Sequence, residues 1–250
     1  MFQEEHSMLE LRNTYYAALP TPLQKKWKAH LTLKEFSVGD PLPLNTDRGF
    51  IYFPITCVAM ISIRASGCPS IFLRFSGQSA VIGVAKIFHI SRVELEAEIC
   101  CGGYSFAMPT NVLSQYLDDT MLSTDWNSRY ISLLVDEVSI SAYCAQSHNS
   151  SQRVARVLLE AFDNLPFGSE ITLTHSKLAD LVGVRRETVS LDLGKWAHMG
   201  ILCIKKGAIK IEQRELLSEI ACDCYRQASA SRITALDLWK KLPWVCDDRC

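Results

Sequence analysis

Five residues between positions 185 and 190 carry the donor and acceptor groups needed for polar recognition. They are Arg185, Arg186, Glu187, Thr188 and Ser190. Arginine can donate two hydrogen bonds to guanine in the major groove of DNA, glutamate can accept one from cytosine, and a hydroxyl can bond to a base or a phosphate. At the start of a helix, the positive end of the helix dipole would add affinity for an anion. The segment therefore predicts contact with double-stranded DNA.

Two short helical patterns place these side chains. Thr174 is suited to cap a first helix, residues 178–182 supply its apolar stripe, and Gly183 can adopt the positive φ of a tight turn. A second helix then begins near Arg185 or Arg186. Its inward-facing apolar residues are Val189, Leu193 and Trp196. This arrangement is a helix-turn-helix, and it leaves the five polar residues facing outward.

A basic hairpin follows the second helix. Residues 201–204 and 208–211 are β-like and flank a Lys205-Lys206-Gly207 turn, so the sequence predicts a wing. Residues 171–210 contain seven lysines and arginines against three acids, in a chain whose net charge is -1. We expect Thr174, Lys205 and Lys206 to anchor the DNA backbone, because cations near phosphates displace counterions.

The segment LTHSKLADLVGVRRETVSLDLGKWAHMGIL, followed by a basic hairpin, resembles the DNA-binding domain of the Crp/Fnr (cyclic-AMP receptor protein) superfamily. The family pattern is L-A-x-x-x-G-x-x-R-E-T-V-S-R-x-L-x-x-L, and the glycine, the R-E-T-V-S run and the wing are in register. One departure is Leu191, which stands where the family has a second recognition arginine. The resemblance implies an α+β fold with an antiparallel β-roll like a cyclic-nucleotide-binding jelly roll, a long dimerisation helix and a C-terminal winged helix-turn-helix.

The first half of the chain has the sequence pattern of a β-roll. Helical patterns in residues 8–30 precede short β-like runs separated by Gly, Pro and Asp, which predict an antiparallel barrel or jelly roll. The runs are LTLKEF, FIYFPI, CVAMISI, SIFLRF, SAVIGVA, VELEAEIC and YSFAM. The resemblance makes this region the sensory domain.

The β-roll departs from the family's cyclic-nucleotide site. There the family has a glutamate after a glycine for the ribose and an Arg-Ser/Thr pair for the phosphate. Here Val84 follows Gly83, and Glu94, Glu96 and Glu98 occupy the later segment. Because valine cannot accept hydrogen bonds from the ribose hydroxyls and three acids repel a phosphate, we expect that no cyclic nucleotide binds. The β-roll would then sense another, unknown small-molecule effector, or it would be only a dimerisation scaffold. Arg92 is followed by Val93, whereas the family's phosphate site has a serine or threonine after the arginine.

A long helix is predicted from Trp126 to Ala145, with a stripe at steps of three and four. Its members are Ile131, Leu134, Val138, Ala142 and Ala145. The resemblance implies that this stripe forms a homodimer, which would place two recognition helices on half-sites about one DNA turn apart. The alternative is that the stripe packs on its own β-roll.

These elements predict a division of the chain into four parts. Residues 1–122 are the helical N-terminus and β-roll, 123–148 the dimerisation helix and hinge, 149–228 the winged domain and 229–250 a C-terminal extension. Within the third part, residues 153–162 open the domain as a helix, and Arg214 to Tyr225 form one amphipathic helix.

Composition excludes several classes of protein. The chain is 48% hydrophobic and has no apolar run long enough to span a membrane, and its acidic N-terminus is unlike a signal peptide. We therefore predict a cytoplasmic protein with no membrane partner, for which the resemblance adds RNA polymerase as a partner. No catalytic or nucleotide-binding motif occurs, so we predict that the protein is not an enzyme.

The ten cysteines are predicted to be reduced, without a cofactor or metal. None lies in the first fifty residues, where an iron–sulfur sensor of the Fnr type would have a cluster. Cys222 and Cys224 with Cys246 and Cys250 would make four ligands, but two cysteines at this spacing on one helix point in divergent directions.

Two other functions stay open. The winged domain of an effector-binding or scaffold protein could contact another protein instead of DNA, and the steep salt dependence of DNA binding would separate these cases. Alternatively, the vicinal pair Cys100-Cys101 could make the protein a redox sensor, although neighbours in a strand point to opposite faces. Ordinary packing is the plainer explanation for that pair.

Overall fold

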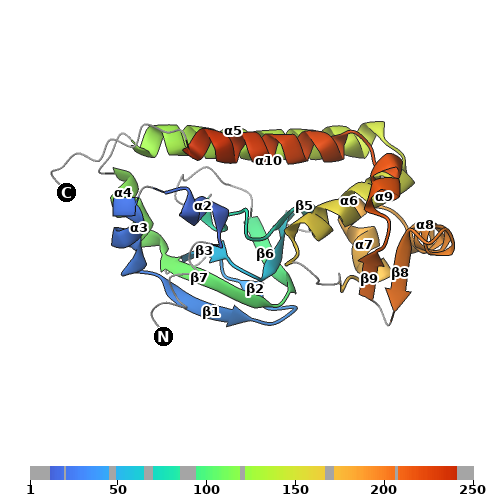
Figure 1. Cartoon of the computed structure of the whole chain (residues 1–250), viewed down its shortest axis with the longest axis horizontal. Helices are drawn as coiled ribbons and strands as arrows, with labels where there is room; N and C mark the ends of the chain where they lie inside the picture. Colours follow the sequence, from blue (N-terminus) through green and yellow to red (C-terminus); the bar gives the residue numbers. More distant parts are fainter. Residues whose placement is uncertain are drawn as a thin grey trace.

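The computed structural model describes residues 12–19, 21–44, 49–64, 70–84, 94–118, 122–166, 172–205 and 208–240. Two antiparallel sheets form the N-terminal half, two long helices run along one side of the molecule, and a smaller helical domain with a hairpin forms the C-terminal half (Figure 1). The predicted α+β architecture is confirmed.

Among the described residues, two short helices precede the sheets, α2 (Thr14–Ala17) and α3 (Thr21–Lys28). Asn13 caps α2 through its side-chain oxygen, while its Nδ2 donates to the carbonyl oxygens of Pro54 at 3.0 Å and Ala80 at 2.9 Å. The buried side-chain amide of Asn13 therefore fixes the start of the described chain to the sheets, because buried polar groups in folded proteins are hydrogen-bonded. The predicted helical pattern in residues 8–11 lies outside the described residues.

The sheets contain three and four strands. The order β1-β7-β3 joins Thr32–Phe36, Gly103–Pro109 and Phe50–Pro54. The order β2-β6-β4-β5 joins Pro41–Leu42, Glu94–Cys101, Val58–Arg64 and Ile71–Ser76. All pairs are antiparallel, and apolar side chains from both sheets fill the space between them, among them Tyr52, Ile61 and Ile99.

Six of the seven predicted strand runs are strands in the structure. The prediction for SAVIGVA is wrong across its described residues, which form only an isolated bridge between Tyr52 and Ile82. Gly83 explains the interruption, because its φ of 93° lies outside the β region and a Cβ there would lie 2.7 Å from the carbonyl oxygen of Phe50. The two-residue strand β2 was not predicted.

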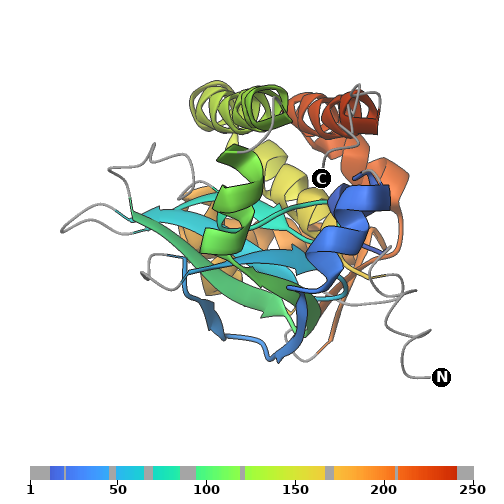
Figure 2. The ribbon, with the colours of Figure 1, turned by 90° about the vertical axis from the view of Figure 1, so that its left-hand side faces the viewer.

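Helix α4 (Thr110–Asp118) leads to the long helix α5 (Leu122–Ser147), which α10 (Cys224–Lys240) accompanies in the opposite direction. Figures 1 and 2 show the two helices side by side above the sheets. Part of the predicted C-terminal extension, residues 229–240, thus belongs to a helix packed on α5. No helix among the described residues has both the length and the apolar character needed to cross a membrane.

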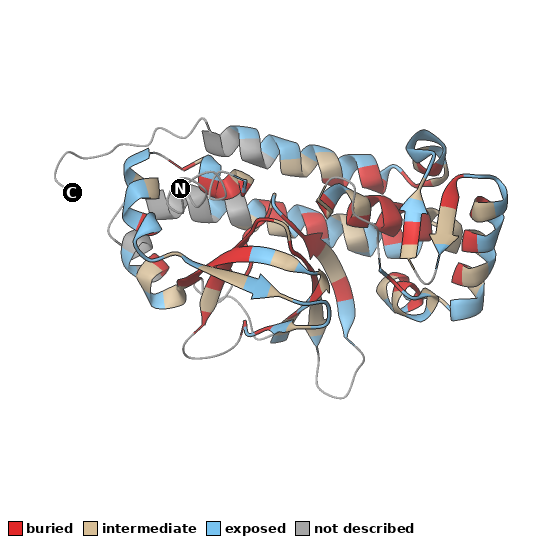
Figure 3. Cartoon of the chain, turned by 60° about the horizontal axis from the view of Figure 1, so that its bottom comes forward, coloured by how far each residue is buried: buried red, intermediate tan, exposed pale blue. Residues whose placement is uncertain are grey.

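Six further elements make up the described part of the C-terminal domain. They are α6 (Ser150–Asn164), α7 (His175–Val182), α8 (Arg186–His198), the hairpin β8 (Leu202–Lys205) and β9 (Ala208–Ile211), and α9 (Arg214–Ile220). Asn149 separates α6 from α5 with a capping box that includes Gln152. The domain core is continuous with the sheets, because Phe72 and Phe75 of β5 belong to the same apolar cluster as Val154 and Leu158 of α6. Figure 3 shows buried residues both in the sheets and in the helices of the C-terminal domain.

The predicted single helix from Arg214 to Tyr225 is wrong. Helix α9 ends at Ile220, and Ala221 has extended dihedral angles, φ -64° and ψ 154°. A separate helix, α10, begins at Cys224.

Candidate DNA interface

Thr174 begins the helix-turn-helix. Its side-chain oxygen accepts the backbone N–H of Lys177 at 3.1 Å, which makes it the N-cap of α7 as predicted. Thr174 is exposed, and a hydroxyl that accepts one hydrogen bond can still donate another, so it could donate to a phosphate.

Gly183 makes the turn. Its φ of 69° and ψ of 44° are left-handed, and the N–H of Val184 donates to the carbonyl oxygen of Ala179 at 3.0 Å. A non-glycine residue is disfavoured in this conformation, which explains why the sequence places glycine here. The turn allows α8 to begin at Arg186, only four residues after α7 ends.

Helix α8 has a buried face and an exposed face. Val189, Leu193 and Trp196 are buried as predicted. Arg185, at the N-cap, and Arg186 and Glu187, in the first turn, are exposed. None of the ion pairs among the described residues involves Arg185 or Arg186. The first turn of α8 therefore presents two guanidinium groups to solvent.

The two predicted hydroxyls of α8 are less accessible. Thr188 and Ser190 are half-buried, and Ser190 Oγ lies 2.9 Å from His175 Nδ1 at the start of α7. His175 was not predicted, because a contact across fifteen residues leaves no signal in the local spacing. The pair places an imidazole and a hydroxyl beside the outward face of the recognition helix.

Leu191 lies on the exposed surface of α8 with 75% of its area accessible. Leucine side chains are more often buried than exposed, and nothing in the described part of the chain covers this one. At the position of the family's second recognition arginine, the recognition helix therefore offers an apolar side chain.

The hairpin forms the expected wing. Leu202 pairs with Ile211 and Lys205 with Ala208, and Lys205 is exposed at the end of β8. Lys206, the second predicted backbone anchor, lies outside the described residues. Lys210 forms an ion pair with Glu212 at 2.9 Å, so part of the local positive charge is compensated.

The predicted dimerisation stripe divides into two groups. Val138, Ala142 and Ala145 are exposed, whereas Ile131 is half-buried and Leu134 packs partly on the chain's own sensory core. Val135 is 57% exposed and was not predicted. If Val135 is counted in the stripe in place of Leu134, the stripe residues are 131, 135, 138, 142 and 145. Their spacing alternates between four and three, as it does where two helices pair.

Val138, Ala142 and Ala145 also border a cleft of about 1080 Å³. Its other walls come from strands β4 and β5, the first half of α6, and α7 with the turn after it, so they belong to both halves of the molecule.

The family's nucleotide-binding positions have other partners here. Val84 is fully buried. Glu96 pairs with Arg64 at 2.9 Å, and Glu98 pairs with Lys177 of α7 at 2.9 Å. Arg92 lies outside the described residues.

The vicinal cysteines lie at the end of β6. Cys100 Sγ lies 3.4 Å from the carbonyl oxygen of Val58, and burial is the main cause that raises the pKa of Cys100 to about 12. Such a thiol stays protonated near neutral pH and is therefore a poor nucleophile.

Comparisons with known proteins agree with this geometry. Residues 152–220 match the model of the Crp-like helix-turn-helix domain. A Crp/Fnr-family transcriptional regulator from Eubacterium rectale has a TM-score of 0.64 at 17% identity, covering 82% of this chain and 96% of its own. FixK2 from Bradyrhizobium japonicum has a TM-score of 0.62 at 17% identity, covering 77% and 98%. A Crp/Fnr-family regulator from Thermus thermophilus has a TM-score of 0.57 at 21% identity, covering 76% and 98%.

A search of curated proteins gives no match. The C-terminal domain is nevertheless a Crp-like helix-turn-helix domain. The chain as a whole has the fold of the Crp/Fnr transcription regulators.

Proposed function

We propose that this protein is a transcription regulator that binds an inverted-repeat operator as a homodimer. One observation carries the proposal: the first turn of α8 presents Arg185, Arg186 and Glu187 to solvent while its opposite face is buried in the domain core. Arg186 and Glu187 read bases, and Arg185, Thr188 and Ser190 make mixed base and phosphate contacts. Thr174, Lys205 and Lys206 hold the backbone.

The homodimer is supported by the exposed apolar side of α5. Val135 and Val138 are 57% and 46% accessible in a single chain, and Ala142 and Ala145 continue the same side. A second copy of α5 placed there by two-fold symmetry would cover these residues, with the alanines allowing close approach. The two recognition helices would then meet half-sites about one turn apart.

The effector is a small molecule other than a cyclic nucleotide. The buried Val84 cannot reach a ribose, and Glu96 and Glu98 place negative charge where the family binds a phosphate. The cleft between β5, α6 and α7 is the place for an effector to act, because a ligand there would contact both halves of the molecule.

Selection from a random duplex pool tests the proposal. Purified protein should enrich an inverted repeat, and its affinity for the winning sequence should fall steeply with salt, since each phosphate contact releases counterions. Binding that is weak on all sequences, with no enriched repeat, would contradict a specific DNA reader and favour a protein partner for the winged domain.

Arg186→Ala is expected to weaken binding to the selected site by about 1–3 kcal/mol and to relax selectivity at one base position. The reason is the loss of a two-bond contact with a guanine edge. Lys205→Ala is the control, and it should weaken selected and random DNA about equally. Equal losses on both DNAs for Arg186→Ala would remove that residue from base readout. The readout is a binding titration on both duplexes.

Leu191→Arg is expected to change the selected half-site at one position. The exposed leucine can contact only an apolar group such as a thymine methyl, whereas arginine would favour guanine there. Repeating the pool selection with the variant measures this shift. An unchanged half-site would mean that residue 191 does not face a base.

A further inference from the structure

Four potential metal ligands meet where α5 ends and α10 begins. They are Cys144, His148, Cys222 and Cys224, whose ligand atoms all lie within 4.8 Å of one another. The three cysteines are buried and His148 is half-buried. We call this group the Cys3His cluster.

Local structure brings the four side chains together. Cys144 and His148 are one helical turn apart, and the N–H of His148 donates to the carbonyl oxygen of Cys144 at 3.2 Å. Cys222 lies in the break between α9 and α10, and Cys224 is the first residue of α10. The break allows the two thiols to converge, which a single continuous helix would prevent.

The sequence predicts no metal site here, because it predicts Cys222 and Cys224 on one helix, where the two sulfurs point in divergent directions. The four-ligand alternative pairs them with Cys246 and Cys250, which lie outside the described residues. The partners in the structure lie almost eighty positions earlier in the chain: Cys144 is in the last turn and a half of α5, and His148 directly follows that helix.

We propose that the Cys3His cluster binds one Zn²⁺ ion. Tetrahedral zinc has Zn–S bonds of about 2.3 Å and Zn–N bonds of about 2.0–2.1 Å, which place neighbouring sulfurs about 3.8 Å apart and sulfur and nitrogen about 3.5 Å apart. In the structure, Cys144 Sγ and Cys222 Sγ are 3.4 Å apart, and Cys224 Sγ and His148 Nδ1 are 3.6 Å apart. These distances match two edges of such a tetrahedron.

The compactness of the cluster favours a single ion over an iron–sulfur cluster. Iron–sulfur clusters place several iron and sulfide atoms between their cysteine ligands, which spreads the thiolates. Ligand atoms within 4.8 Å of one another leave room for one metal atom at the centre. Three thiolates and one imidazole are a common donor set of structural zinc sites.

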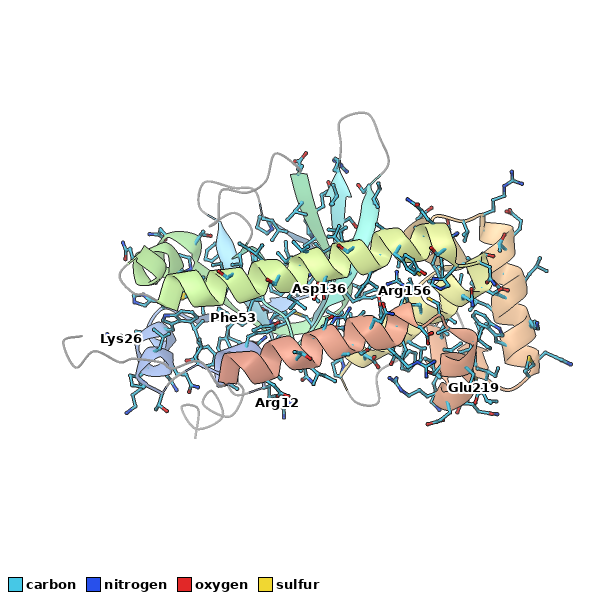
Figure 4. All side chains as sticks on the ribbon, turned by 90° about the horizontal axis from the view of Figure 1, so that it is seen from above. Arg12, Lys26, Phe53, Asp136, Arg156 and Glu219 are labelled. Carbon is cyan, nitrogen blue, oxygen red and sulfur yellow. The ribbon has the colours of Figure 1, made fainter. Side chains whose placement is uncertain are left out.

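The surroundings of the cluster compensate its charge. One Zn²⁺ ion with three thiolates has a net charge of -1, and buried charge needs a partner. Arg156 of α6 is a buried cation that can fill this role. Figure 4 shows Arg156 between the end of α5 and the start of α10. Its ion pair with Glu160, at 3.0 Å, fixes the guanidinium.

The position of the site indicates what the ion does. A bound ion would connect the end of α5, the proposed dimerisation helix, to the break between α9 and α10, which follows the wing. The ion would thereby fix the angle between the dimer seam and the recognition helices. Metal binding should therefore raise operator affinity by ordering the winged domain. This consequence rests on the proposed function, whereas metal binding itself does not.

Titration of the metal-free, reduced full-length protein with Co²⁺ and then Zn²⁺ tests the site. We expect one Co²⁺ per chain, with thiolate-to-cobalt charge-transfer absorption and the strong visible bands of tetrahedral cobalt, and displacement by one Zn²⁺. Cys222→Ser and His148→Ala should each weaken binding by more than about 100-fold. Cys203→Ser, at a half-buried cysteine of β8, is the matched control and should bind like the unmodified chain.

Several results would overturn the zinc site. These are no cobalt bound by the unmodified chain, iron with acid-labile sulfide in the protein purified without oxygen, or a Cys144–Cys222 disulfide in place of the metal. Unchanged metal affinity in both Cys222→Ser and His148→Ala would also overturn the zinc site. The titration of the unmodified chain decides the matter even if a variant fails to fold, which circular dichroism detects. Unchanged operator affinity after zinc removal would refute only the role in positioning the winged domain.

Discussion

Replacing Ala142 with glutamate is expected to convert the protein from a dimer to a monomer and to lower its affinity for an inverted-repeat operator by about 10²–10⁴-fold. Ala142 lies at the centre of the exposed side of α5, next to Val138. In a two-fold dimer the new carboxylate would face its own copy, so that two like charges and two larger side chains would be forced together. Losing the dimer removes the simultaneous engagement of two half-sites.

Sedimentation and operator titration together measure this effect. Ala230→Glu makes the same substitution at an exposed alanine of α10, and it should leave both the dimer and the affinity unchanged. A dimer that survives Ala142→Glu would show that this side of α5 is not the seam. A monomer that keeps full operator affinity would show that the dimer is not needed for recognition.

Glu137→Ala is expected to destabilise the fold by about 3–5 kcal/mol, because it leaves two cations without their shared carboxylate. Glu137 is only 6% exposed and lies between Arg232 of α10, at 3.0 Å, and Arg74 of β5, at 3.4 Å. The carboxylate thus joins the helix pair to the sheet beneath it. For a chain of this size, the loss corresponds to a fall in melting temperature of about 6–20 °C.

Denaturant unfolding at one fixed protein concentration gives the free energy, because an oligomer's stability depends on concentration. Asp136→Ala is the matched control: it removes an exposed carboxylate from the adjacent position of α5 (Figure 4). Exposed charges contribute little, so the control should change stability by less than about 0.5 kcal/mol. A similarly small effect of Glu137→Ala would mean that the arginines find other partners.

Much of the fold could be predicted from local patterns. The strands around Ile61 and Phe106 and the turn at Gly183 follow from alternation and from glycine's backbone freedom, which are properties of neighbouring residues. The interruption at Gly83 was missed because it depends on the close approach of the Phe50 carbonyl. The end of α9 at Ile220 was missed as well, and Cys222, just after it, packs with the distant Cys144. Local secondary-structure propensity does not depend on such tertiary contacts and cannot predict them.

The same distinction applies to the sites. The outward residues of α8 could be predicted because one helix positions them all, and the helix has a clear inward stripe. The contact between His175 and Ser190 joins two helices, and the Cys3His cluster joins α5 to the α9–α10 break. Neither has a spacing that a reader of the sequence could recognise. Arg232, which completes the environment of Glu137, lies in the predicted C-terminal extension, for which the sequence shows no packing partner.

The apolar cluster shared by β5 and α6 limits how freely the two halves can be separated. Phe72 and Phe75 pack in one core with Val154 and Val157, and Asn164 accepts the backbone N–H of Gly77 at 3.0 Å. A winged domain expressed alone would expose that side of α6 to water, which favours aggregation. Grafting it onto the sensory half of another regulator would therefore require a complementary apolar strand face, so the domain is not an interchangeable module.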